Sequence, residues 1–238
     1  MDIVVSIGGS VLVPDLSSET VSRYARAIER ISDDHSLSVV VGGGKTARDY
    51  IDVARDLGAN DSICDYMGID VTRINARLLI SALPESAYPE PPTSYREAED
   101  ALADDKVPIM GGMAPGQTTD AVAAVFSEYT NADLLVYATS VDGVYTSDPS
   151  SDDDAERFDR LTPEELVEVV MQTQLSAGSN SVVDALAAKI IERSGVRTLV
   201  LDGTDPENLE DAVLEGVHTG TEVVPEGYSE SQGVLDDF

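Results

Sequence analysis

The sequence contains few of the residues that form disulfides, bind metals or attract nucleic acids. Its 238 residues include one cysteine, Cys64, and two histidines, His35 and His218. A single cysteine excludes an intramolecular disulfide, and together with two histidines it leaves no Cys/His metal cluster. Lys and Arg number 15, of which three are lysine, against 45 Asp and Glu, so the formal net charge is −30. Such a surface repels nucleic acids and anionic membranes, and neither is an expected partner.

The sequence also lacks a basic leader and any apolar run approaching about eighteen residues. A signal peptide and a membrane span are therefore not expected, and the lone cysteine favours a cytoplasmic location. The acidic residues are scattered along a chain that is 42% hydrophobic, which argues against disorder. Scarce lysine with more Asp (27) than Glu (18) is typical of proteins adapted to a salt-filled, halophilic cytoplasm.

Short β-branched runs alternate with helical patterns along the chain. The nearly continuous apolar character of the runs suits a parallel sheet covered by helices on both faces, which predicts an α/β fold. We expect one domain over 1–225, followed by an acidic tail, 226–238, that frays. The expected strands are 3–7, 37–41, 107–110, 134–138 and 198–201. The expected helices are 18–31, 45–57, 66–82, 95–103, 119–130, 163–171, 180–194 and 206–215.

Glycine follows three of the expected strands, at 8–9, 42–44 and 111–112. Ligands of open parallel sheets bind beyond the carboxyl ends of the strands, where glycine lets backbone N–H groups approach phosphate oxygens. Each loop alone is equally consistent with a purely conformational role, but together they favour a polyphosphate ligand. A P-loop is not expected, because Val39 stands where that motif needs its first glycine, and no G-x-G-x-x-G follows the first strand.

Charged residues accompany these loops. Lys45 and Arg48 fall in the first turn of the following helix, where the helix dipole disfavours cations, so they indicate an anionic ligand unless they form an ordinary surface pair. Asp120 opens the helix expected at 119–130 and could orient a lysine, a water or Mg²⁺ beside a phosphate, or be only a favourable N-terminal charge. The segment 139–149 carries Tyr145, against which a base or ribose could pack.

Four motifs together resemble the amino-acid kinase superfamily, and most closely its archaeal uridylate (UMP) kinases: Ile7-Gly8-Gly9-Ser10, Val39 to Lys45, Thr118-Thr119-Asp120 and Val141 to Pro149. The resemblance runs from residue 1 to about 224. It implies a three-layer αβα sandwich around a mainly parallel sheet of about eight strands. It also implies γ-phosphoryl transfer from ATP to UMP in pyrimidine nucleotide biosynthesis, with Mg²⁺ bound mainly through the ATP phosphates and no metal site made by side chains alone. Family members commonly form homohexamers built from dimers.

The resemblance also implies roles for individual residues, with UMP bound by the N-terminal part of the domain and ATP by the C-terminal part. Asp120 would organise the catalytic centre, and Asp65 would accept hydrogen bonds from the UMP ribose, although capping of the helix expected at 66–82 is the alternative. The implied ATP contacts are Gly9, Ser10, Gly44, Arg48, Thr139, Ser140, Tyr145 and Asp148. The implied UMP contacts are Gly43, Asp65, Met113, Ala114, Pro115, Gly116, Gln117, Thr118 and Thr119.

The sequence departs from the family pattern at several positions. Ser6 stands where many members have lysine, and the helix expected at 180–194 has no basic residue before Lys189. Met113 and Gln117 stand where relatives often have Thr and His, so UMP contacts there would use the backbone more than the side chain. The candidate transition-state cations are Lys45, Arg48, Lys189 and Mg²⁺. Two other functions stay open: a kinase for another acceptor, such as isopentenyl phosphate or N-acetylglutamate, and a non-catalytic nucleotide- or oxyanion-binding protein.

Overall fold

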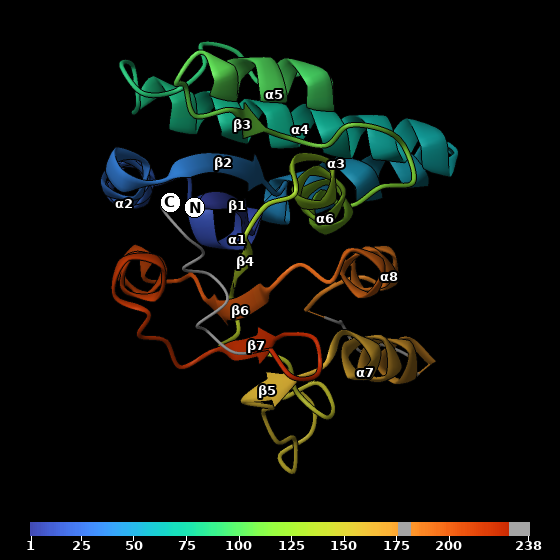
Figure 1. The fold of residues 1–238 in the computed structure, drawn as a ribbon. Helices are drawn as coiled ribbons and strands as arrows, with labels where there is room; N and C mark the ends of the chain where they lie inside the picture. Colours follow the sequence, from blue (N-terminus) through green and yellow to red (C-terminus); the bar gives the residue numbers. More distant parts are fainter. Residues whose placement is uncertain (176–181, 229–238) are drawn as a thin grey trace, which may run out of the picture.

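The computed structural model describes residues 1–175 and 182–228, and their centre is a seven-stranded sheet (Figure 1). The strand order is β3-β2-β1-β4-β6-β7-β5, and every pairing is parallel except that of β6 with β7. The three-layer fold and the five expected strands are confirmed. The two further strands, β5 and β7, have only two and three residues, too few for a recognisable pattern. The strands are β1 (Asp2–Ile7), β2 (Ser36–Val41), β3 (Ile109–Met110), β4 (Leu134–Thr139), β5 (Arg160–Leu161), β6 (Thr198–Asp202) and β7 (Thr221–Val223).

Helices cover both faces of this sheet and bury two separate apolar cores. Alternate residues of β1 explain the division: Ile3, Val5 and Ile7 pack towards α2, α4 and α9, whereas Val4 packs towards α5, α6, α7 and α8. In Figure 1, α2 lies on one side of the strands, and α6, α7 and α8 lie on the other. The helices are α1 (Gly9–Leu12), α2 (Ser18–Asp34), α3 (Gly44–Asp56), α4 (Asp61–Ser81), α5 (Tyr95–Ala103), α6 (Thr119–Thr130), α7 (Pro163–Leu175), α8 (Ala185–Ser194) and α9 (Pro206–Glu210), which continues as the π-helical turn η1 (Asp211–Glu215).

Capping residues explain where two helices depart from the predicted ranges. The helix expected at 66–82 begins earlier, at Asp61, because the side chain of Asn60 accepts a hydrogen bond from the Ile63 N–H at 3.0 Å. The helix expected at 180–194 begins later, because the Asp184 carboxylate caps it through the N–H groups of residues 186 and 187. Residues 180 and 181 of that range lie outside the described residues, as do residues 229–238 of the tail.

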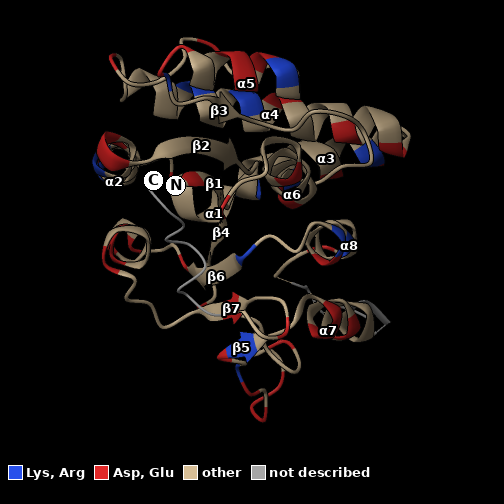
Figure 2. Cartoon of the chain, viewed as in Figure 1, with Lys and Arg blue, Asp and Glu red and all other residues tan. Residues whose placement is uncertain are grey.

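The surface of the fold is acidic, as the composition requires. Figure 2 shows Asp and Glu on α2, on α7 and on the loop beside β5, with far fewer Lys and Arg. Across residues 1–175 and 182–228, no helix is long and apolar enough to cross a membrane.

Candidate active site

A cleft of about 660 Å³ opens at the carboxyl ends of the central strands β1, β2 and β4. This is where ligands of open parallel sheets bind. Residues expected on the ATP side and the UMP side line the same cleft, but Tyr145 and residues 113–116 are not part of its lining. The lining includes Gly9, Ser10, Gly43, Gly44, Arg48, Asp65, Gln117, Thr118, Thr119, Asp120, Thr139, Ser140 and Asp148.

Two glycine loops meet backbone to backbone at the floor of this cleft. A Cβ atom added to Gly9 would lie 2.2 Å from the Gly44 nitrogen and 2.4 Å from the Gly42 oxygen. Gly44 has a φ of +64°, a conformation that other residues rarely adopt. It also begins α3, whose positive N-terminal end favours an anion. The glycines following β1 and β2 are thus required by close packing, and they place a helix N-terminus at the cleft.

We expect a Gly9→Ala substitution to lower kcat about tenfold while the sheet stays folded. The added methyl group meets backbone atoms, which cannot rotate away, so the two loops must separate. Steady-state kinetics and circular dichroism measure the two effects. Gly58→Ala is a matched control for activity, because its added Cβ meets no atom within 4 Å, although its φ of +86° adds strain. A Gly9→Ala variant with wild-type kcat would contradict the close packing.

Within residues 1–175 and 182–228, Arg48 is the one Lys or Arg in the lining of the cleft. Lys45 instead donates to the Asp49 carboxylate at 2.5 Å, one turn along α3 on the exposed surface. Lys189 donates to Glu192 at 2.8 Å, also at the surface. The surface-pair interpretation therefore holds for Lys45, and of the three candidate side-chain cations Arg48 is the one that lines the cleft.

Asp120 is held by groups from two neighbouring strands. Ser6 and Tyr137 lie opposite each other in the β1–β4 register. The Ser6 hydroxyl donates to the Asp120 carboxylate at 3.3 Å, and the Tyr137 hydroxyl donates to the Asp120 carbonyl oxygen at 2.9 Å. Burial raises the pKa of Tyr137 well above its ordinary value, so this hydroxyl keeps its proton and stays a donor. The central strands thus fix both the backbone and the side chain at the first turn of α6.

The charge state of Asp120 is set by its surroundings. Burial, and then the negative charge of Asp184, raise the pKa of Asp120 to about 7, while the hydrogen bond from Ser6 lowers it. Asp184 also accepts a hydrogen bond from the Thr118 hydroxyl, which joins the start of α6 to the start of α8. Asp184 was not identified from the sequence as part of this site. An Asp before the apolar pattern of α8 was a detectable capping signal, but its proximity to Asp120 depends on the packing of α6 against α8.

We expect a Ser6→Ala substitution to move the pH dependence of kcat/KM to higher pH. In the wild type, the rate should rise with pH as Asp120 loses its proton near pH 7. Removing the Ser6 donor disfavours the ionised form and raises the pKa of Asp120 further. Substrates also titrate in this range, but identically for both proteins, so the comparison isolates Ser6. Ser6→Thr keeps the hydroxyl and should restore the wild-type profile; superimposable profiles for Ser6→Ala and wild type would contradict the assignment.

Asp65 lies in the second turn of α4, so the expectation that it stands at a helix start is wrong. Asn60 caps this helix, and the capping alternative for Asp65 is therefore excluded. Its carboxylate accepts a hydrogen bond from the Gly116 N–H at 2.8 Å. Gly116 has a φ of +80°, which suits glycine. The structure thus joins Asp65 to the loop 113–119.

The segment after β4 forms another wall of the cleft through Ser140, Val141 and residues 148–150. Tyr145 lies behind this wall, where its hydroxyl donates to the Asp142 carboxylate at 2.7 Å. Asp142 and its second partner, Arg157, were not identified from the sequence.

Comparisons with known proteins agree with this geometry. The model of the amino acid kinase family matches residues 1–202. The uridylate kinase of Haloarcula marismortui is 57% identical over 227 residues, which cover 95% of this chain and 100% of the relative. The uridylate kinase of Methanococcoides burtonii is 53% identical over 233 residues, covering 94% and 100%. The crystal structure of uridylate kinase from Archaeoglobus fulgidus matches with a TM-score of 0.85 and 49% identity, covering 94% of this chain and 100% of that one.

Proposed function

The chain belongs to the amino acid kinase family, and we infer that it transfers the γ-phosphoryl group of ATP to UMP, giving UDP and ADP for pyrimidine nucleotide synthesis. One observation of the structure carries the proposal. Asp120 lines the same cleft as the glycine loops expected to hold ATP phosphates and the loop expected to hold UMP. The acidic, lysine-poor composition and the identity to a Haloarcula marismortui protein fit a salt-adapted source.

In phosphoryl transfer, the protein mainly positions the two substrates and stabilises the charge on the phosphoryl group. On the UMP side, we assign ribose recognition to Asp65 and the remaining contacts to Gly43 and residues 113–119. On the ATP side, Gly9, Ser10, Gly44 and Arg48 would contact phosphates. Thr139, Ser140, Tyr145 and Asp148 would contact the adenosine. A net charge of −30 gives no long-range attraction to anionic substrates, so Arg48, the backbone N–H groups and a helix terminus act at short range.

Mg²⁺ fits this site as an ion that arrives with ATP. Within the described ranges, no group of three or more His, Cys, Asp or Glu side chains could hold a metal ion by itself. The Asp120 carboxylate and the Ser10 and Thr119 hydroxyls supply the oxygen donors that Mg²⁺ accepts when phosphates provide its other ligands. Asp120 would hold the ion from the protein side. Bound there, Mg²⁺ neutralises charge on the phosphate oxygens.

A panel of acceptors tests the proposal. ADP release is followed in molar KCl with Mg-ATP and UMP, CMP, dUMP, isopentenyl phosphate or N-acetylglutamate. We expect UMP to give the highest kcat/KM, because Asp65 and the polar loop 113–119 suit a ribose-bearing acceptor rather than an apolar one. Faster transfer to isopentenyl phosphate or N-acetylglutamate would establish the alternative acceptor. Binding of ATP without any acceptor-dependent ADP release would establish the non-catalytic alternative.

We also propose that the protein self-associates, as a homohexamer built from dimers. The support is an apolar surface on α3 and α4, where Tyr50, Val53 and Leu57 recur at helical spacing and are 59%, 60% and 83% exposed. Tyr66 and Ile74 of α4 are 59% and 55% exposed. A cytoplasmic location stays a prediction.

Acidic substitutions on this apolar surface of α3 and α4 are expected to prevent the protein from self-associating. The double substitution Val53→Glu and Leu57→Glu should reduce the molar mass in size-exclusion chromatography with light scattering, with an unchanged circular dichroism spectrum, because burying two carboxylates in an apolar interface is costly. Val217→Glu is the matched control, because Val217 is 62% exposed and lies outside α3 and α4. Wild-type mass for the double variant would contradict an interface at this surface.

A further inference from the structure

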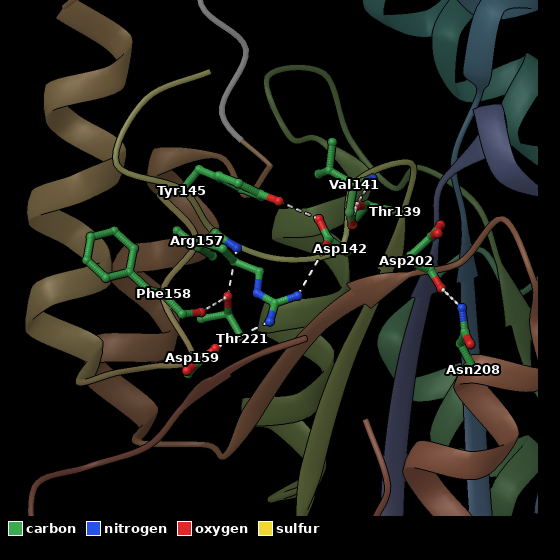
Figure 3. A network of polar contacts seen from close by, with 11 residues as sticks. Thr139, Val141, Asp142, Tyr145, Arg157, Phe158, Asp159, Asp202, Asn208 and Thr221 are labelled. Atoms are coloured by element: carbon green, nitrogen blue, oxygen red, sulfur yellow. Dashed lines mark hydrogen bonds and ion pairs between the residues drawn. The ribbon is translucent and has the colours of Figure 1, made fainter. Parts of the chain in front are cut away.

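Arg157 lies at the centre of a polar network behind the ATP side of the cleft (Figure 3). Its guanidinium donates to the Asp142 carboxylate at 2.8 Å and to Asp159 at 3.3 Å. The other oxygen of Asp142 accepts the hydroxyl of Tyr145 at 2.7 Å. Arg157 and Tyr145 therefore share one carboxylate, and the three side chains form a chain from guanidinium to phenol. Asp159 is 91% exposed at its side chain, so its pair with Arg157 contributes little.

This network closes the base of the loop that walls the cleft. Tyr145 and Arg157 face each other in an isolated antiparallel bridge, flanked by hydrogen bonds from Thr146 N–H to the residue 156 carbonyl and from Phe158 N–H to the Val144 carbonyl, both 2.9 Å. The residues between them include 148–150, which line the cleft. The bridge between Tyr145 and Arg157 thus determines how residues 148–150 are presented to the cleft.

The chain accommodates Arg157 at a cost. Gly143 has a φ of +155°, and a Cβ there would lie 2.7 Å from Cδ of Arg157 and 2.5 Å from the Thr221 hydroxyl. The side chain of Arg157 is 26% exposed, yet its Nε atom is buried and has no hydrogen-bond partner among the described residues. A buried donor without a partner destabilises the fold. The position of Arg157 is therefore not explained by its contribution to the stability of the fold.

Arg157 fixes the position of the Asp142 carboxylate by holding the oxygen that Tyr145 does not use. Burial raises the pKa of Asp142, but the Tyr145 hydrogen bond, a backbone hydrogen bond and Arg157 together lower it below its ordinary value. An ionised carboxylate is the stronger acceptor for the phenol. The Tyr145 side chain is thereby held at the base of the loop that carries residues 148–150 to the cleft.

We propose that Arg157 is a positioning residue for ATP, which acts through Asp142 to orient Tyr145 and the loop that carries Asp148. The inference rests on the proposed function, because it assumes that this wall receives ATP. It assigns to Arg157 no contact with the substrate.

Kinetics with both substrates test the inference. Arg157→Met should raise the KM for ATP about tenfold and the Kd of Mg-AMP-PNP by the same factor, with kcat and the KM for UMP within about twofold. Arg157→Lys should recover part of the ATP affinity, because lysine retains the charge but not the forked geometry. Asp142 is 43% exposed and keeps Tyr145 as a hydrogen-bond partner, so removing the arginine should leave the Tm nearly unchanged. Arg160→Met is the control, because Glu222 keeps its 2.8 Å partner Arg197 when Arg160 is removed.

A double-mutant cycle with Tyr145→Phe identifies the route. If Arg157 acts through the Tyr145 hydroxyl, the double variant binds Mg-AMP-PNP no more weakly than Arg157→Met alone. Additive losses would overturn the route through Tyr145. An unchanged KM for ATP, or equal losses for both substrates with a lowered Tm, would overturn the positioning role. Failure of the wild type to release ADP with UMP would instead overturn the proposed function, and Mg-AMP-PNP binding would still test Arg157.

Discussion

Replacement of Asp120 by asparagine is expected to lower kcat about a thousandfold while the KM values for ATP and UMP change less than about threefold. Asparagine has nearly the same shape and can still accept the Ser6 hydrogen bond, so the first turn of α6 keeps its position. Only the negative charge is lost, at the point where the proposed mechanism needs it. Stopped-flow or steady-state ADP release measures kcat, and Mg-AMP-PNP and UMP titrations measure binding. A kcat within tenfold of wild type would remove Asp120 from the chemistry.

The same substitution should stabilise the protein at alkaline pH. The pKa of Asp120 is raised from 3.8 to about 7 by burial and by Asp184. A carboxyl group with a raised folded-state pKa stabilises the fold fully below its unfolded pKa, and this contribution is lost as pH rises through the folded pKa. At pH 8 the wild type therefore bears the cost of a partly buried charge beside Asp184, which asparagine removes. We expect a gain of about 2–4 kcal/mol at pH 8 and a smaller one at pH 5, measured by denaturant unfolding. No gain at pH 8 would contradict the burial of this charge.

The sequence predicted the parts of this site that depend on neighbours along the chain. Glycine after a buried strand indicates where the chain leaves a parallel sheet, and the loops at 8–9 and 42–44 do meet at the cleft. The helix expected from residue 163 likewise begins there, where Thr162 and Glu165 cap each other at 2.8 and 3.2 Å. Such signals depend only on residues that are close together in the sequence, so they can be interpreted without the tertiary structure.

Contacts across the fold were not predictable in the same way. Asp184 is 64 positions from Asp120, and its influence exists only because α8 packs beside α6. The Asp142–Arg157 pair required knowledge that the loop after β4 folds back on itself. Asp65 was placed at a helix start because the apolar pattern of α4 becomes clear only after its first turn, whereas the cap at Asn60 begins the helix earlier. For Asp184 and for the Asp142–Arg157 pair, the missing information was which segments pack together in the folded protein. For Asp65 it was the position of the first residue of α4.

Replacement of Arg48 by alanine is expected to lower kcat/KM about a hundredfold, the second largest effect. Among the described residues, Arg48 is the one Lys or Arg in the lining of the cleft, whereas Lys45, on the same turn of α3, is paired with Asp49. We therefore propose Arg48 as the side-chain cation for a transition state that carries charge on phosphoryl oxygens, and losing a cation there costs about 3 kcal/mol. High salt screens long-range fields but not a contact inside the cleft, so the loss should persist in molar KCl. Arg55→Ala, on an exposed face of α3, is the control. An Arg48→Ala variant that matches Arg55→Ala in kcat/KM would leave backbone N–H groups and Mg²⁺ as the only stabilising charges and would refute a role for this side chain.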